Sequence, residues 1–183
     1  MIDIQKLTQT RAFARQDGAI LGLVWIAGFA CIMLATTPSR AFLGLIGNLL
    51  TISTPFVVAK RLKIFRDYAL EGQISFRRGL FYSFQTFFNA TLLLTIVQYL
   101  WFRYMDLGNF MMMLQASYQS MAQAYQLTAE QAKTLLDAIS MMKPIAWASM
   151  FMTTDLIVGA ILSPIIAAIM ARNTKREQII NHQ

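Results

Sequence analysis

The stretch KRLKIFRDYALEGQISFRR, residues 60–78, separates two long apolar segments of the chain. Its cations are Lys60, Arg61, Lys63, Arg66, Arg77 and Arg78, set against only two carboxylates, Asp67 and Glu71. A loop this basic stays on the cytoplasmic side of a bilayer, because positive charge near apolar segments resists translocation. The stretch therefore predicts its own cytoplasmic location and the sidedness of the apolar segments around it. Gly72 is expected to end the helix that enters it, and Ser75 to cap the next one.

Composition indicates a membrane protein. The chain has 183 residues, of which 56% are hydrophobic and 14% are charged, whereas a soluble domain is about 45–50% apolar and about 25% charged. Its length suits a single membrane domain over residues 1–183. The net charge of +7 could indicate nucleic acid, but the cations border apolar segments instead of covering one soluble face. We therefore expect no nucleic-acid partner.

Four apolar segments are each near the roughly 20 residues that a helix needs to cross a bilayer. They cover about residues 18–37, 41–59, 79–102 and 145–170. The first continues too far to be a cleaved signal peptide and is expected to remain as an anchor. Pro55 removes a backbone donor from the second segment and is expected to kink it. The predicted fold is an all-α polytopic membrane protein with four transmembrane helices.

Residues 105–143 are too polar to cross a bilayer, yet their pattern is helical. Thr128 and Gln131 have the spacing of a capping box, and apolar residues recur at helical intervals on both sides of them. Pro144 suits the first turn of the last span. We expect an extracytoplasmic helical hairpin between the third and fourth spans. Twelve of the sixteen Lys and Arg residues lie in the N-terminus, the basic stretch and the tail, which predicts that both termini are cytoplasmic.

Three short motifs carry a resemblance to a known family. They are Gly72-Gln73-Ile74-Ser75-Phe76, Phe102-Arg103-Tyr104-Met105-Asp106, and the opening of the first span from Asp17 to Leu23. In order and spacing they resemble the G-x-I-S-F, F-x-Y-I-D and G-x-x-x-G-L elements of an uncharacterised bacterial inner-membrane family, a domain of unknown function with four predicted spans. The resemblance covers nearly the whole chain. It implies a multi-pass protein of the bacterial inner membrane, and it implies no activity.

Asp155 is the sharpest candidate site, because it lies near the middle of the last span. A charged carboxylate at that depth costs roughly 2.5–3.5 kcal/mol on insertion scales. One interpretation is a proton or cation site formed with Asn48, Gln85 or Asn89. The other is a structural hydrogen bond between helices, assisted by the neighbouring threonines. Both predict that Asp155 faces the bundle interior within reach of a polar side chain.

Small residues mark faces where helices approach closely. Gly18 and Gly22 form a GxxxG pair that Gly28 extends, and Gly159 and Ser163 make a similar face on the last span. These faces would also permit self-association.

Metal and catalytic sites find little support in the sequence. Met111, Met112 and Met113 invite a copper interpretation, but consecutive residues of a helix point in different directions and the single histidine, His182, lies in the tail. The single cysteine, Cys31, lies inside a span and is expected to be a small apolar residue. No metalloprotease, serine-hydrolase or Walker motif occurs. We expect no catalytic residues, no metal and no cofactor.

The sequence thus favours a non-enzymatic membrane module that contacts lipid and self-associates or supports a membrane-protein partner. An alternative is a small transporter or channel subunit that uses Asp155. A third hypothesis is binding of anionic lipid by the cations of residues 60–78.

Overall fold

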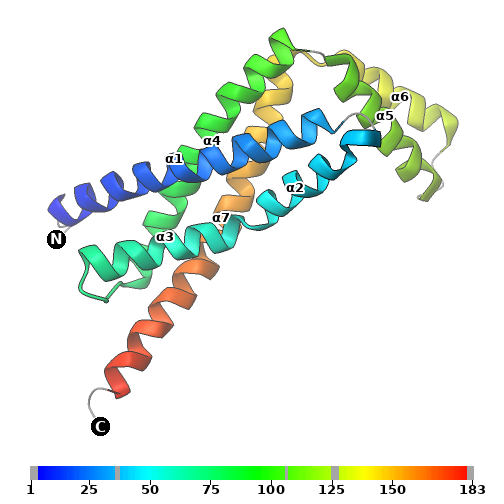
Figure 1. Cartoon of the computed structure of the whole chain (residues 1–183). Helices are drawn as coiled ribbons and strands as arrows, with labels where there is room; N and C mark the ends of the chain where they lie inside the picture. The colour runs from blue at the N-terminus through cyan, green and yellow to red at the C-terminus, as the bar shows by residue number, and fades with distance from the viewer. Residues whose placement is uncertain (1–3, 36–37, 106, 125–127, 181–183) are drawn as a thin grey trace.

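The computed structural model describes residues 4–35, 38–105, 107–124 and 128–180, and for residue 38, some positions between residues 107 and 135, and residues 172–180 it describes the backbone alone. Every regular element in these ranges is helical (Figure 1). The helices are α1 (Ile4–Leu34), a single 3₁₀ turn η1 (Pro38–Arg40), α2 (Ala41–Ile52), α3 (Thr54–Ala69), α4 (Phe76–Tyr104), α5 (Leu107–Ala124), α6 (Ala129–Ser140) and α7 (Pro144–Ile180). The predicted all-α fold is confirmed.

Three helices are long and apolar enough to cross a membrane: α1, α4 and the part of α7 from Pro144 to Ala171. The helices α2 and α3 qualify together as a fourth span, bent by 42° at their junction. These long apolar helices indicate a multi-pass membrane protein with three or four spans. The bend lies at Ser53, and Pro55 occupies the first turn of α3, where its missing N–H leaves no hydrogen bond unmade.

The first and last helices extend well beyond the apolar segments that predicted them. The helix α1 starts at Ile4 instead of near Gly18, and α7 continues to Ile180 instead of ending near Met170. Tertiary contacts explain the early start, because Thr10, Ala14 and Asp17 are buried although they precede the apolar run. Hydropathy locates the membrane-crossing part of a helix, but it does not locate the end of the helix.

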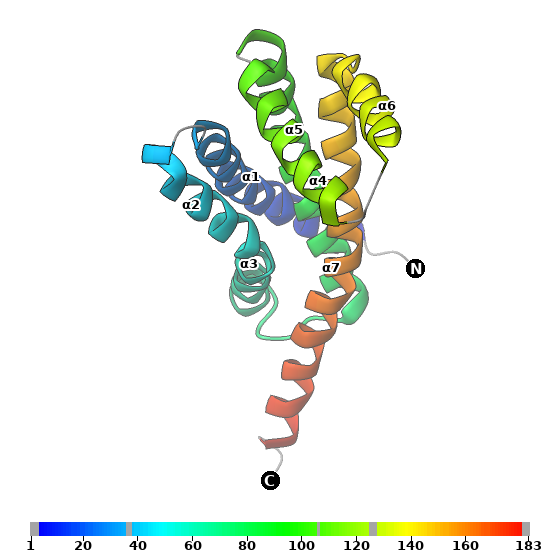
Figure 2. The ribbon, with the colours of Figure 1, turned by 90° about the vertical axis from the view of Figure 1, so that its right-hand side faces the viewer.

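The helix α4 lies between α1 and α7 and makes its most extensive contacts with these two helices (Figures 1 and 2). The helix α2 packs on α1, and α3, which continues α2 after the bend, contacts α1, α4 and α7. The largest fully buried side chains are Tyr82, Phe65, Phe87, Leu21 and Leu62. They come from α1, α3 and α4, and α7 adds Trp147, Ile166 and Met170 to the same core.

The bundle has two opposite ends, called here the basic end and the hairpin end. The basic end holds the turn between α3 and α4, and the hairpin end holds α5 and α6. At the basic end, the N–H groups of Leu70 and Gly72 both donate to the carbonyl of Arg66 at 3.1 Å, and Gly72 has a φ of +79°. The Oγ of Ser75 accepts from the N–H of Arg78 at 3.4 Å. Gly72 therefore lies in the turn that ends α3, and Ser75 caps α4, as the sequence predicts.

At the hairpin end, α5 and α6 touch each other, and α5 is fastened to the bundle by Phe110. The Phe110 ring lies 5.0 Å from Phe102 and 5.1 Å from Trp147, measured between ring centroids. The capping box at the start of α6 is present: Gln131 N–H donates to Thr128 Oγ1 at 3.3 Å, and Thr128 N–H donates to Gln131 Oε1 at 3.1 Å. Asp106 and His182, named above, lie outside the described residues.

Candidate functional site

The small residues of α1 lie against α4 and α2. A Cβ added at Gly18 would lie 2.6 Å from the Cβ of Asn89 and 2.9 Å from the carbonyl oxygen of Thr86. At Gly22 the nearest atom, on Leu93, would be 3.1 Å away. Gly28 faces the backbone of Gly47 on α2, whose carbonyl oxygen would lie 3.3 Å from an added Cβ. The approach at Gly18 leaves no room for a Cβ, whereas at Gly22 and Gly28 a neighbouring atom would have to shift by a few tenths of an ångström.

The small residues of α7 lie against the opposite face of α4. An added Cβ at Gly159 would lie 2.7 Å from the Cβ of Phe87. Ser163 is fully buried, and its hydroxyl donates to the carbonyl of Gly159 at 2.6 Å. Gly18, Gly22, Gly28, Gly159 and Ser163 thus all lie in contacts between helices of one chain. Because these faces are covered from within, they are not the surface through which a second molecule would associate.

A buried carboxylate joins three helices near the basic end. Asp17 of α1 is 2% exposed. The Nε of Arg61, on α3, donates to Asp17 Oδ1 at 2.6 Å, and the same carboxylate forms an ion pair with a terminal nitrogen of this guanidinium. The hydroxyl of Tyr82, on α4, donates to Asp17 Oδ2. Burying a charge is costly unless it is paired and hydrogen-bonded, and here both carboxylate oxygens have a partner.

Sequence reasoning missed this cluster. The sequence places Arg61 among the cations that predict membrane topology and anionic-lipid binding, and it places Asp17 at the start of a family-like motif. The available signal was a single acid at the start of an apolar run in a chain whose cations outnumber its acids. Such an acid is expected to find one of those cations once the chain folds.

The other five cations of the basic stretch divide into two groups. Arg78 donates through Nε to Thr10 Oγ1 at 2.9 Å and through a terminal nitrogen to Gln9 Oε1 at 2.8 Å, and so ties α4 to α1. Arg66 is 4% exposed and donates through Nε to Asp67 Oδ1 at 2.8 Å. Lys60, Lys63 and Arg77 are exposed. The stretch therefore both fastens α3 and α4 to α1 and presents free positive charge to its surroundings.

The predicted polar site around Asp155 is not assembled by hydrogen bonds. Asn89 donates to the carbonyl of Ala14 on α1 at 3.4 Å. Asn48 is exposed on α2, and Gln85 is half-buried on α4. Oδ2 of Asp155 is buried, and within the described ranges no hydrogen bond joins Asp155 to any of these three amides.

The residue that packing places opposite Asp155 is Thr91. In the antiparallel pair α4 and α7, Gly79 faces Ala167 and Phe87 faces Gly159. One helical turn toward the hairpin end moves about four residues forward on α4 and back on α7, which brings Thr91 level with Asp155. The hydroxyl of Thr91 is fully buried and has no partner among the described atoms. Both groups thus have unused hydrogen-bonding capacity at the same level of the contact between α4 and α7, which we call the α4–α7 seam.

Further buried polar atoms follow the same seam. Among the described residues, the buried side-chain atoms without a hydrogen-bond partner lie on α4 and α7, with one exception on Arg66: Ser83 Oγ, Thr91 Oγ1, Gln98 Oε1, Trp147 Nε1 and Asp155 Oδ2. Ser83, Thr91 and Gln98 recur at intervals that keep them on one face of α4. Most buried polar groups in proteins are hydrogen-bonded, often to water. The α4–α7 seam therefore has isolated polar positions within an otherwise apolar contact.

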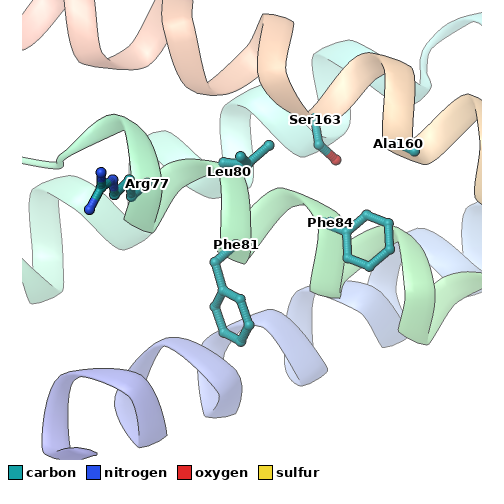
Figure 3. A pocket seen from close by; sticks show the side chains of 6 residues that line it. All are labelled: Arg77, Leu80, Phe81, Phe84, Ala160 and Ser163. Carbon is teal, nitrogen blue, oxygen red and sulfur yellow. The ribbon is translucent and has the colours of Figure 1, made fainter. Parts of the chain in front are cut away.

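A groove of about 360 Å³ opens between α4 and α7 toward the basic end (Figure 3). Leu80, Phe81 and Phe84 form its wall on α4, and Ala160 and Ser163 form its wall on α7. Arg77 lies at the end of this apolar channel, one turn before Phe81. The groove thus combines an apolar lining with one cation at its end.

Comparison with known proteins identifies the family and no closer relative. No group of three His, Cys, Asp or Glu side chains placed to hold a metal occurs in the described part of the chain. No curated protein and no solved structure matches the sequence. A family model described as a protein of unknown function, DUF4199, matches residues 16–172. This match includes all four predicted spans, and the chain belongs to the DUF4199 family of proteins of unknown function.

Proposed function

We propose that this protein is a non-enzymatic module of the bacterial inner membrane that self-associates through the exposed face of α2. Both termini and the basic end lie in the cytoplasm, and the α5–α6 hairpin lies on the opposite side. The distribution of Lys and Arg along the sequence supports this orientation. Because the small-residue faces of α1 and α7 pack against other helices of the same chain, association requires another surface.

One observation carries the proposal: Asn48 is exposed in the middle of an apolar face. Around it, Leu45, Leu49 and Ile52 are 65–68% exposed. The side-chain amide of Asn48 has no hydrogen bond to any residue that the structure describes. An amide left without a partner in hydrocarbon is costly, so such residues promote association of membrane helices. An amide both donates and accepts, and two copies related by a two-fold axis would satisfy each other.

Resonance energy transfer between two labelled copies in liposomes tests this proposal. Replacing Asn48→Leu keeps the side chain compatible with lipid and removes the amide. Interhelical hydrogen bonds in membranes are worth about 0.6–2 kcal/mol, so we expect association to weaken by roughly 3- to 30-fold.

Thr153→Leu is the matched control, because Thr153 is an exposed polar residue on another span. It should leave association unchanged. Equal association of wild type and Asn48→Leu would show that α2 is not the interface.

A second candidate function is a small transporter or channel subunit that uses Asp155. The buried Oδ2 of Asp155 and the buried hydroxyl of Thr91 favour it, because the carboxyl can take up a proton and the hydroxyl can bind water beside it. The tight contact of Gly159 with Phe87, one turn toward the basic end, opposes it by closing the seam.

Proteoliposomes with an entrapped pH-sensitive dye decide between the two. Transport predicts proton flux in wild type that is lost in Asp155→Asn and kept in Asp137→Asn, which changes an exposed acid on α6. Flux at the level of empty liposomes would remove this candidate.

A further inference from the structure

The groove between α4 and α7 has the features of a site for one lipid chain. Its volume of about 360 Å³ lies within the roughly 300–1,000 Å³ that is usual for ligand pockets. Its walls are apolar, since the hydroxyl of Ser163 is already used by the carbonyl of Gly159. Phe84 on one rim is 42% exposed, and Ile161 and Ile165 of the neighbouring helix face are more than half exposed. On a membrane-spanning helix such side chains face acyl chains, so the groove opens toward lipid.

Positive charge is concentrated at one end of this groove. Arg77 is exposed, and its guanidinium pairs with no carboxylate that the structure describes. The guanidinium of Arg11, on α1, lies 5.8 Å from the centroid of the Phe81 ring. Arg77 begins the helical turn that precedes Leu80, where α4 passes from the polar turn into its apolar part. With α4 spanning a bilayer, these two cations would lie near the depth of lipid headgroups, beside an apolar channel.

We propose that this groove binds an anionic phospholipid, with its phosphate on Arg77 and one acyl chain along Leu80, Phe84 and Ala160. A planar guanidinium donates two parallel hydrogen bonds to phosphate, and basic pockets between membrane helices favour anionic headgroups. From Arg77 to Phe84 the helix rises about 10 Å, which is most of one leaflet of a bilayer whose hydrocarbon is about 30 Å thick. A free phosphate ion would use the cation alone and leave the channel without a role.

This inference does not rest on the proposed self-association, because no residue of the groove belongs to α2. It also differs from general attraction of lipid to the basic stretch, because it assigns the phosphate to one cation, Arg77, and the acyl chain to one channel. Lys60 and Lys63 are also exposed at the same end of the bundle, but they do not line the groove. The two ideas therefore make different predictions for single substitutions.

Native mass spectrometry of the full chain in a neutral detergent, with phosphatidylglycerol added, measures the binding directly. Wild type should retain one phosphatidylglycerol in preference to phosphatidylcholine. Arg77→Gln should weaken retention of phosphatidylglycerol about fivefold, as expected for one cation near a membrane surface. Lys63→Gln, the matched control, should leave it unchanged. An equal loss in both variants would overturn the proposal, because the attraction would then be non-specific.

Two further variants test the channel with its charge intact. Leu80→Trp fills it from α4, and Ala160→Phe narrows it from α7, where the native residue is exposed. Each should abolish retention of both lipids while Arg77 remains. Undiminished binding in both would overturn the proposal, and so would displacement of the lipid by millimolar inorganic phosphate, which would indicate an anion site without a chain.

Discussion

Asp17 shows how a single side chain fixes the relation of three helices. Its two oxygens have partners of different kinds, a guanidinium from α3 and a phenol from α4. Loss of the phenol removes one hydrogen bond to a charged group, which is worth about 1.5–3 kcal/mol. Loss of the guanidinium leaves a carboxylate that is 2% exposed without a counter-charge. The two losses are therefore unequal, although both remove a contact to the same residue.

We predict that Arg61→Leu destabilises the protein by about 3–5 kcal/mol and Tyr82→Phe by less, because only the first leaves a buried charge unpaired. Thermal unfolding in detergent measures the difference. The double variant Asp17→Leu/Arg61→Leu should be more stable than Arg61→Leu alone, since it removes the stranded charge as well. If Tyr82→Phe proved the more harmful of the two single changes, the ion pair would not be the main support of the cluster.

At the scale of elements, α4 is the helix against which the others are positioned. Its contact with α1 depends on the absence of a side chain at Gly18, and its contact with α7 depends on the same absence at Gly159. Gly44 on α2 is different, because an added Cβ would meet only the Cβ of Ala35, at 3.5 Å. The three glycines thus separate the effect of close packing from the effect of helix propensity.

Gly18→Ala is expected to destabilise the α1–α4 pair by about 1–3 kcal/mol, the usual cost of overpacking. Gly44→Ala should be neutral or stabilising by up to about 1 kcal/mol, because alanine is the better helix former and the added methyl fits. Unfolding in detergent of both variants beside wild type provides the comparison. Similar behaviour of the two variants would mean that α1 can move away from α4 without cost.

Phe110 is expected to be the anchor of the hairpin. Phe110→Ala removes the ring that contacts Phe102 and Trp147, so hydrogen exchange in α5 and α6 should accelerate while α1, α4 and α7 keep their protection. Met112→Ala, at a residue that is 61% exposed, should leave exchange at the wild-type rate. Uniform acceleration across all helices would show instead that the aromatic cluster supports the whole bundle.

At the scale of the whole molecule, sidedness connects the sequence to the membrane. The basic end and the hairpin end lie at opposite ends of the α4–α7 pair (Figure 1). Since α4 and α7 are both candidate spans, the two ends are expected on opposite sides of the bilayer. The excess of cations at the basic end predicts which side is cytoplasmic.

In intact cells, a membrane-impermeant thiol reagent should label Met141→Cys and should label Lys63→Cys only after permeabilisation. Both positions are exposed, and both variants are made with Cys31→Ala to remove the native thiol. Labelling of the Lys63 position from outside would reverse the proposed orientation and the cytoplasmic assignment of both termini.

Features set by local sequence were predictable. The capping box at Thr128, the break near Pro55 and the turn at Gly72 each depend on residues within a few positions of one another. Asp17 and its partners are 44 and 65 residues apart in the chain, and no local pattern connects them. The early start of α1 was missed for the same reason, because distant side chains bury its polar first turns. The glycines of α1 and α7 lie in contacts between helices, but the sequence does not distinguish a partner helix in the same chain from one in another molecule.

The bend at Ser53 affects how the protein meets its surroundings on one flank. A helix bent by 42° reaches less far along the bilayer normal than a straight helix with the same residues, so hydrophobic mismatch differs around the circumference of the molecule. Each ångström of mismatch costs a fraction of a kcal/mol, so where α2 and α3 cross as one bent span, the lipid beside α2 would thin relative to the lipid beside α7. Pairing of two copies along α2 would bury both short flanks and relieve that elastic strain, which gives the bilayer itself a share in the driving force for assembly.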